Sequence, residues 1–188
     1  MQTRMIYLVR HGQYVSNEVK SIEGMPARRL ASLHDGGLTA LGTKQAEHVA
    51  ERLSGYPISK VYCSSLPRAV QTAKIIVERF PHLSLQTRGL FRECTPFVEN
   101  EDACNRALKA YGELFKYAVG EDKHEIVVCH GNLLRYFVSL ALGLEPDGWA
   151  TMGTFHCGIT QMAIDRKGVR LISHNDFGHI PDAMRTKL

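Results

Sequence analysis

The chain of 188 residues has the length of one ordinary domain, and its 44% of hydrophobic residues are enough to fill one core. Its net charge of +4 is modest and its Lys and Arg residues form no basic run, so neither nucleic acid nor a membrane is indicated as a partner. No apolar stretch approaches the ~20 residues of a transmembrane helix, and the five cysteines lack CxxC spacing, which favours reduced thiols in a cytosol-like compartment.

Six short apolar runs are predicted to be strands. The first begins by Met5, which leaves no room for a signal peptide, and it ends abruptly in Arg10 and His11. In chain order the six runs are 6–10, 60–63, 83–87, 125–129, 159–164 and 169–173.

Four helical patterns lie between these runs. The first begins after Thr39, a candidate N-cap, and the second follows Ser65, with Pro67 tolerated in its first turn. The third carries apolar residues at spacings of three and four from 104 to 118. The fourth, 133–144, is apolar nearly all round and is predicted to be buried between layers.

The repeated order of strand and helix predicts one α/β domain over residues 1–188, with a mainly parallel sheet that helices cover on both faces. Such sheets place their sites at the carboxyl ends of strands. Two irregular stretches, 18–37 and 94–101, are long enough to shape a binding site. Three polar strand ends are expected to converge on one edge, namely Arg10-His11, Ser64-Ser65 and Cys129-His130.

Two arginines and two histidines are expected at this edge. Burying Arg10 and His11 in mid-sheet would be costly, so they are predicted to face a cleft. His130 leads directly into a helix whose unpaired first-turn amides can bind an anion. Arg68 lies in the first turn of another helix, where it could instead merely cap the surface. Because such cations repel one another, their convergence indicates a bound phosphoryl group.

Glu93 is the carboxylate that we place beside this cluster. It would donate a proton to a leaving oxygen if partial burial keeps it protonated, and the alternative is a salt bridge to Arg92 or another neighbour. No HxxxH or HxH pair indicates a metal site, and His156 beside Cys157 is interpreted as packing. Walker, Rossmann, GxSxG and HExxH motifs are absent, which disfavours other phosphoryl chemistries.

Five short motifs follow one another along nearly the whole chain. They are Arg10-His11-Gly12 with Asn17, Leu38-Thr39-x-x-Gly42-x-x-Gln45-Ala46, Ser64-Ser65-Leu66-x-Arg68-Ala69-x-x-Thr72-Ala73, Arg92-Glu93, and His130-Gly131-Asn132-x-x-Arg135. In this order they resemble the histidine phosphatase (phosphoglycerate mutase-like) superfamily. The resemblance implies a three-layer α/β/α sandwich and a covalent phosphohistidine intermediate, with no metal and no other cofactor.

The resemblance also implies a role for each matching residue. His11 would be the nucleophile and Glu93 the proton donor. The phosphate would be held by Arg10, Asn17, Arg68 and His130, with further donors from the region of Asn132. The surrounding cations would keep His11 unprotonated and stabilise the charge on the phosphoryl oxygens. Water would then attack the phosphohistidine, with Glu93 as the base.

Within the superfamily, the chain most resembles the mitochondrial Ser/Thr protein phosphatases. The residues that carry this resemblance are Gln13-Tyr14, Gly148-Trp149, Gly158-Ile159-Thr160 and the segment 176–187. The amino-terminal anchor of that branch is missing here, which favours a cytoplasmic location. True mutases are longer, so hydrolysis is favoured over mutase activity, and the resemblance to this branch implies a phosphoprotein as the substrate.

Several alternatives stay open at this point. They are a small-molecule phosphatase acting on sugar phosphates or α-ribazole phosphate, a mutase, and an inert phosphate-binding adaptor. The joint presence of His11, Glu93 and His130 argues against the adaptor, which would need no nucleophile and no acid. Homo-oligomerisation is left open as well.

Overall fold

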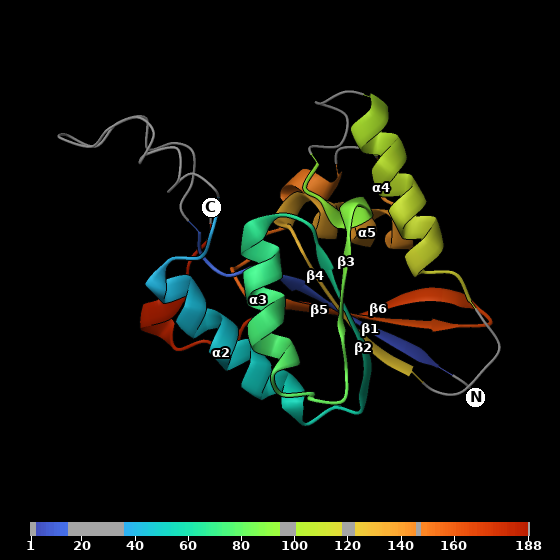
Figure 1. Ribbon diagram of the computed structural model, residues 1–188. Helices are drawn as coiled ribbons and strands as arrows, with labels where there is room; N and C mark the ends of the chain where they lie inside the picture. Colours follow the sequence, from blue (N-terminus) through green and yellow to red (C-terminus); the bar gives the residue numbers. More distant parts are fainter. Residues whose placement is uncertain (1–2, 15–35, 95–100, 118–122, 146–147, 188) are drawn as a thin grey trace, which may run out of the picture.

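The structure, a computed structural model, describes residues 3–14, 36–94, 101–117, 123–145 and 148–187 (Figure 1). Within them the six predicted strands form one sheet in the order β3-β2-β4-β1-β5-β6. Most of the stretches 18–37 and 94–101, predicted to shape the site, lies outside the described residues. The strands are β1 (Arg4–Arg10), β2 (Ile58–Ser64), β3 (Leu85–Arg88), β4 (Lys123–Cys129), β5 (Ile159–Asp165) and β6 (Gly168–Asp176).

The prediction of a mainly parallel sheet is confirmed. Strands β1 to β4 pair in parallel, whereas β5 runs antiparallel to β1, and β6 runs antiparallel to β5. Ile159 at the start of β5 pairs with Val9 near the end of β1. The segment that precedes β5 therefore reaches the same edge of the sheet as the carboxyl ends of the parallel strands.

The helices follow the predicted patterns. Thr39 caps the first of them, because its Oγ1 accepts from the amide of Gly42 at 3.0 Å. The prediction of a helical pattern up to 118 is wrong in extent, since the helix ends at Leu114 and Phe115 continues the buried stripe without a further turn. The helices are α2 (Ala40–Ser54), α3 (Pro67–Val77), α4 (Glu101–Leu114) and α5 (Gly131–Leu142), with 3₁₀ turns η1 (Gly89–Phe91), η2 (Gly148–Thr151) and η3 (Asp182–Met184).

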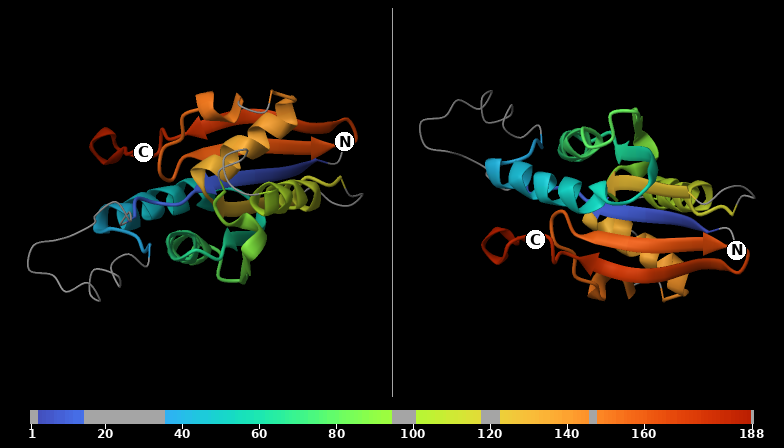
Figure 2. Two further views of the ribbon diagram at one scale, coloured as in Figure 1. Left: turned by 90° about the horizontal axis from the view of Figure 1, so that it is seen from above. Right: turned by 90° about the horizontal axis from the view of Figure 1, so that it is seen from below.

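Two helical layers enclose the sheet, one on each face (Figures 1 and 2). The alternation of side chains along β1 shows why. Ile6 and Leu8 are buried in the cluster that contains α4 and α5, whereas Tyr7 and Val9 are buried in the cluster that contains α2 and α3. Both faces of the central strands are thus apolar and need cover, which gives a three-layer α/β/α arrangement.

Helix α5 lies in an outer layer, although its apolar sequence predicted burial between layers. Leu133 and Phe137 are fully buried against the sheet, but Leu142 is 48% exposed at the helix end. The helix is apolar because α4, η2 and the sheet cover most of its surface. It does not lie at the centre of the molecule. No helix of the described residues has the length and apolar character that crossing a membrane would require.

Candidate active site

Arg10 and His11 stand where β1 leaves the core, between the ends of its two neighbouring strands. The amide of His11 donates to the carbonyl of Cys129 at the end of β4 (3.1 Å), and the amide of Arg10 donates to the carbonyl of Gly158 before β5 (3.2 Å). Both side chains are buried, at 4% and 2% exposure. Backbone pairing on both sides thus fixes the direction in which these two side chains leave the sheet.

Hydrogen bonds set the tautomer of His11. Its Nδ1 lies 2.8 Å from the carbonyl oxygen of Gly12, which can only accept, so the ring proton is on Nδ1. Its Nε2 lies 3.0 Å from Nε of Arg68, which can only donate. Burial, together with the neighbouring imidazole of His130 and the charge of Arg68, holds the pKa of His11 well below its usual 6.5. His11 is thus a neutral imidazole with the lone pair of Nε2 inside the site.

Two glycines let the turn after β1 pack against the start of α2. A Cβ on Gly12 would lie 2.5 Å from the carbonyl oxygen of Gly42, and a Cβ on Gly42 would lie 1.9 Å from that of Gln13. Both contacts involve backbone that cannot move aside. The close approach lets the Gln13 amide reach Oε1 of Gln45 at 2.8 Å, while the Gly12 amide donates to Thr72 of α3 at 3.1 Å. The residues after His11 are therefore anchored to two helices.

Arg68 does not cap the surface. It leaves the first turn of α3, directly after β2, and its guanidinium lies 4.5 Å from the centre of the Tyr14 ring while Nε reaches His11. Tyr14 in turn contacts His11 edge-on, with ring centroids 5.1 Å apart. The stacked tyrosine thus directs the arginine toward the nucleophile candidate.

His130 and Arg10 each keep one buried polar atom without a hydrogen-bond partner among the described residues, Nδ1 and Nε respectively. Nε2 of His130 lies 2.7 Å from Oγ of Ser64 at the end of β2. That Oγ also accepts from the amide of Leu66, and its own proton can go to Nε2; in that tautomer the ring proton of His130 lies on Nδ1. The rings of His130 and His11 lie 5.1 Å apart. The site thus contains unsatisfied donors beside a lone pair, as an anion site requires.

Glu93 caps helix α5. Its Oε1 accepts from the amide of Leu133 at 3.1 Å, and its Oε2 accepts from that of Asn132 at 3.4 Å. The sequence predicted that the first-turn amides of α5 bind the anion. For the amides of Asn132 and Leu133 this is wrong, because both already donate to the carboxylate of Glu93. Burial raises the pKa of Glu93, although these hydrogen bonds partly offset it. Among the described side chains Glu93 forms no ion pair, with Arg92 or with any other.

Arg106 of α4 holds the segment that carries Glu93. Its guanidinium donates to the carbonyls of Leu90 (3.4 Å), Arg92 (2.7 Å) and Glu93 (2.9 Å). Three bonds from one planar group fix the backbone on which the carboxyl group is mounted. Sequence reasoning missed this residue, since nothing local distinguishes it from a surface arginine of a helix.

The remaining predicted residues are Asn132 and Asn17. Asn132 lines the cavity described below, and its Oδ1 accepts from Arg135, whose Nε also donates to the carbonyl of Gly131 at 3.3 Å. Asn17 lies outside the described residues. The structure thus brings together every predicted site residue that it describes, on one edge of the sheet.

His156 belongs to the same cluster, although the sequence interpretation assigned it to packing. Its ring lies 5.7 Å from that of His11, and its Nε2 lies 3.2 Å from Nη2 of Arg10. Thr154, two residues earlier, accepts from Nη1 of Arg10 through its carbonyl at 2.7 Å. The antiparallel direction of β5 brings this segment to the site, and a βαβ reading of the sequence does not predict that direction.

A cavity of about 360 Å³ opens beside these groups. Its wall includes Arg10, Glu93, Asn132, Arg135 and Lys187, and Glu93 is its sole carboxylate among the described residues. His11, Arg68 and His130 do not line this cavity, so it lies beside the phosphate site and offers room for the leaving group.

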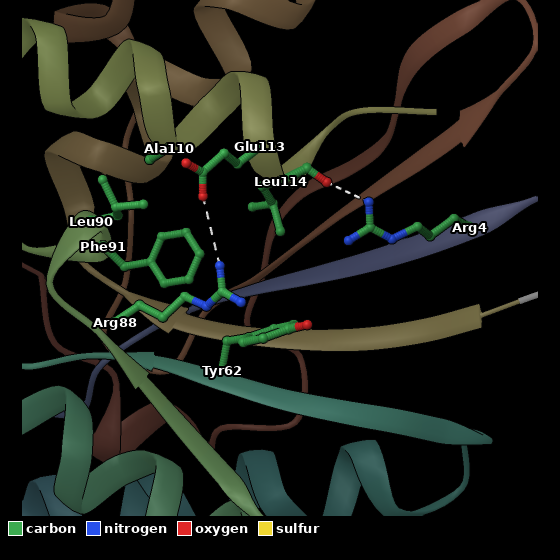
Figure 3. A pocket seen from close by; sticks show the side chains of 8 residues that line it. All are labelled: Arg4, Tyr62, Arg88, Leu90, Phe91, Ala110, Glu113 and Leu114. Atoms are coloured by element: carbon green, nitrogen blue, oxygen red, sulfur yellow. Dashed lines mark hydrogen bonds and ion pairs between the residues drawn. The ribbon is translucent and has the colours of Figure 1, made fainter. Parts of the chain in front are cut away.

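A second, smaller cavity of about 120 Å³ lies beneath α4 (Figure 3). Its two arginines already have partners. Arg88 faces Glu113 at 3.7 Å and stacks on Tyr62, while Arg4 forms an ion pair with Glu125 and donates to the carbonyl of Leu114 at 2.5 Å. Its positive charge is therefore neutralised, and we do not place a phosphate there. The described residues contain no group of three or more His, Cys, Asp or Glu that could hold a metal ion.

The two pKa shifts predict an unusual pH profile. His11 must be deprotonated to attack, and its pKa is lowered, so activity should persist far below pH 6.5. Glu93 must be protonated to act as an acid, so activity should fall as the pH rises through its raised pKa. We expect kcat/KM for a phosphoserine peptide, measured from about pH 4 to pH 8, to be highest on the acid side of neutrality.

The variant Glu93→Gln is the control for this profile. Its basic limb should disappear, whereas a limb caused by ionisation of the substrate would remain. An acid limb near pH 6.5 in the unaltered protein would show that the site does not depress the pKa of His11.

Comparison with known proteins agrees with this geometry. Residues 6–96 and 98–177 match the family model of the histidine phosphatase superfamily, branch 1. The mitochondrial serine/threonine-protein phosphatase Pgam5 of Caenorhabditis elegans is 32% identical over 206 residues, which cover 95% of this chain. The chain spans 65% of the length of that relative.

Solved structures have the same fold. Phosphoglycerate mutase from Plasmodium falciparum matches with a TM-score of 0.63 at 29% identity, covering 94% of this chain and 96% of that one. Phosphoserine phosphatase from Entamoeba histolytica, solved in complex with 3-phosphoglyceric acid, matches with a TM-score of 0.71 at 22% identity, covering 95% and 100%.

Proposed function

The chain belongs to branch 1 of the histidine phosphatase superfamily, and from this we propose that it hydrolyses phosphomonoesters of serine and threonine in proteins through a phosphohistidine on His11. One observation carries the proposal. The buried atoms Nε of Arg10 and Nδ1 of His130 lack partners among the described residues, Arg10 directly precedes His11, and the ring of His130 lies 5.1 Å from that of His11. A tetrahedral phosphoryl group satisfies both donors and presents phosphorus to the lone pair of His11.

The proposed reaction has two steps. Arg68 exchanges its hydrogen bond to Nε2 of His11 for one to a phosphoryl oxygen, which frees the lone pair of Nε2. Nε2 then attacks phosphorus, the bond to the leaving oxygen breaks, and Glu93 gives that oxygen its proton. Water then attacks the phosphohistidine, Glu93 takes a proton from it, and the bond from phosphorus to nitrogen breaks. Arg10, Arg68 and His130 stabilise the charge on the phosphoryl oxygens in both steps. The resemblance adds Asn17 and the Asn132 region to the groups that hold the phosphate.

A protein substrate is supported by the similarity to Pgam5 along 95% of this chain. The cavity beside the phosphate site gives a phosphorylated side chain space to enter. A peptide that continues beyond the cavity would then rest on the wall formed by residues 150–154, which comprise the end of η2 and the three residues after it.

A small-molecule substrate is the second candidate, and the charge of the cavity favours it. Arg10, Arg135 and Lys187 line the wall together with the single carboxylate of Glu93. A small phosphomonoester with a second anionic group matches such a wall. Sugar phosphates and α-ribazole phosphate are further small-molecule candidates, and a monophosphate among them would use the phosphate site alone.

One substrate panel separates these candidates. Phosphoserine peptides, free phosphoserine, 3-phosphoglycerate, sugar phosphates and α-ribazole phosphate are compared by kcat/KM in buffer with EDTA. We expect a phosphopeptide to exceed every small molecule by about tenfold or more. A preferred small molecule would establish the second candidate, and conversion of phosphoglycerate without release of phosphate would identify a mutase. Binding without turnover would identify an adaptor, and loss of activity in EDTA would contradict the metal-free mechanism.

A further inference from the structure

The guanidinium group of Arg10 is held from one side by the segment that precedes β5. Nη1 donates to the carbonyl of Thr154 at 2.7 Å and to its Oγ1 at 3.3 Å, and Nη2 lies 3.2 Å from Nε2 of His156. Nε, which has no partner among the described residues, is left for the substrate. The orientation of the group that binds phosphate therefore depends on a histidine that has no assigned role.

The hydrogen-bond partners of His156 determine which of its ring nitrogens carries the proton. A guanidinium group has no acceptor, so Nε2 of His156 must accept and the ring proton must lie on Nδ1. Nδ1 lies 2.9 Å from Oγ1 of Thr186 and 3.2 Å from its carbonyl oxygen, and both can accept that proton; the hydroxyl is the nearer acceptor. Burial and the charge of Arg10 lower the pKa of His156 to about 3, so the ring stays neutral. Since both ring nitrogens are engaged, His156 has none left for the phosphate.

Thr186 is itself held from two directions. The amide of His156 donates to its carbonyl at 2.9 Å, and Nε2 of Gln45 donates to its Oγ1 at 2.8 Å and to the carbonyl of Met184 at 2.6 Å. Gln45 also accepts from the amide of Gln13, two residues after His11. The segment after η3 is thereby connected to α2 and to both sides of the phosphate site.

We propose that Thr186 and His156 are positioning residues that orient Arg10, so that the segment 184–187 forms part of the phosphate site. Thr186 fixes the imidazole through Nδ1, and the imidazole fixes the guanidinium through Nε2. The proposal rests on the proposed function only in taking Arg10 as a phosphate ligand. It concerns the resting protein, and no step of turnover is needed to examine it.

Two matched pairs of variants test the proposal. His156→Gln places an amide oxygen near the position of Nε2 and can still accept from Arg10, whereas His156→Asn is too short and retains only the Nδ1 side. Thr186→Ser keeps the hydroxyl, and Thr186→Val removes it at nearly constant shape. We expect His156→Asn and Thr186→Val to weaken the binding of inorganic phosphate about tenfold and Thr186→Ser to change it less than about twofold. His156→Gln keeps the bond to Arg10 but loses the one to Thr186, so it should weaken binding no more than Thr186→Val does.

Isothermal calorimetry measures the binding of inorganic phosphate to each variant. Circular dichroism measures the thermal unfolding of the same variants. For each weakened variant KM should rise with the phosphate Kd while kcat changes little, a separation that general loss of structure does not produce. The double variant His156→Asn/Thr186→Val should bind phosphate no more weakly than His156→Asn alone, because both changes interrupt one path.

Three results would overturn the proposal: unchanged phosphate affinity in Thr186→Val, equal losses in Thr186→Ser and Thr186→Val, or additive losses in the double variant. If His156→Asn does not fold, the Thr186 pair alone decides. A failure of the proposed function is a separate result, since it would be lack of turnover with phosphate binding unchanged.

Discussion

The variant His11→Ala is expected to lose phosphomonoester hydrolysis by ~10⁴-fold or more, with its fold intact. The expectation follows from Nε2, whose lone pair lies among Arg68, His130 and Arg10 in a neutral ring. None of these neighbours can replace it, because a guanidinium group has no free electron pair and His130 is turned toward Ser64. Loss of the nucleophile therefore removes the first bond-forming step.

Trapping of the intermediate measures this directly. Rapid quenching with labelled substrate should leave phosphate on His11 that is labile in acid and stable in base. The exposed His82→Ala variant is the control for loss of a histidine, and it should turn over and trap label normally. Acid-stable phosphoserine at any position, or label on His130 in the unaltered protein, would contradict the mechanism.

The second large effect concerns Glu93 and depends on the leaving group. An alkoxide such as that of serine leaves only when protonated, whereas nitrophenolate leaves readily without a proton. We therefore expect Glu93→Gln to slow hydrolysis of phosphoserine peptides by ~10²-fold or more and to slow nitrophenyl phosphate much less. Single-turnover rates of phosphoenzyme formation with the two substrates measure the difference.

A neighbouring carboxylate provides the matched control. Asp102 of α4 is exposed, and it lines a separate, open surface cavity together with Glu93 and Arg106. Asp102→Asn should leave both substrates unaffected. Because Gln in place of Glu93 can weaken the cap on α5, thermal unfolding of both variants is compared. Equal losses on the two substrates would mean that Glu93 acts electrostatically and that the proton comes from another group.

The predicted strands and helices agree closely with the structure because local patterns decide them. The apolar run before Arg10 forms β1, and Thr39 provides the side-chain oxygen that caps α2. The two wrong predictions concern the end of α4 and the layer in which α5 lies, and tertiary packing decides both. The stripe that continues to Phe115 is buried although the helix ends at Leu114, and α5 lies in an outer layer although its sequence is largely apolar.

The candidate site divides in the same way. His11, Arg68, His130 and Glu93 could be placed from sequence, because parallel strands bring their carboxyl ends to one edge and the motifs name the residues. His156 could not be placed, since its position depends on β5 running antiparallel to β1. The role of Glu93 as cap of α5 was also hidden, because the two segments are far apart in the chain.

By itself, the sequence determined the α/β class, the order of the elements and the groups that carry the chemistry. Hydrophobic periodicity, caps and strand-end charges are local properties, and local properties can be read along a chain. The tertiary structure alone decided the tautomer of His11, the unpartnered donors around it, and the path from Thr186 through His156 to Arg10. These depend on distances of about 3 Å between residues far apart in sequence, which no local pattern encodes.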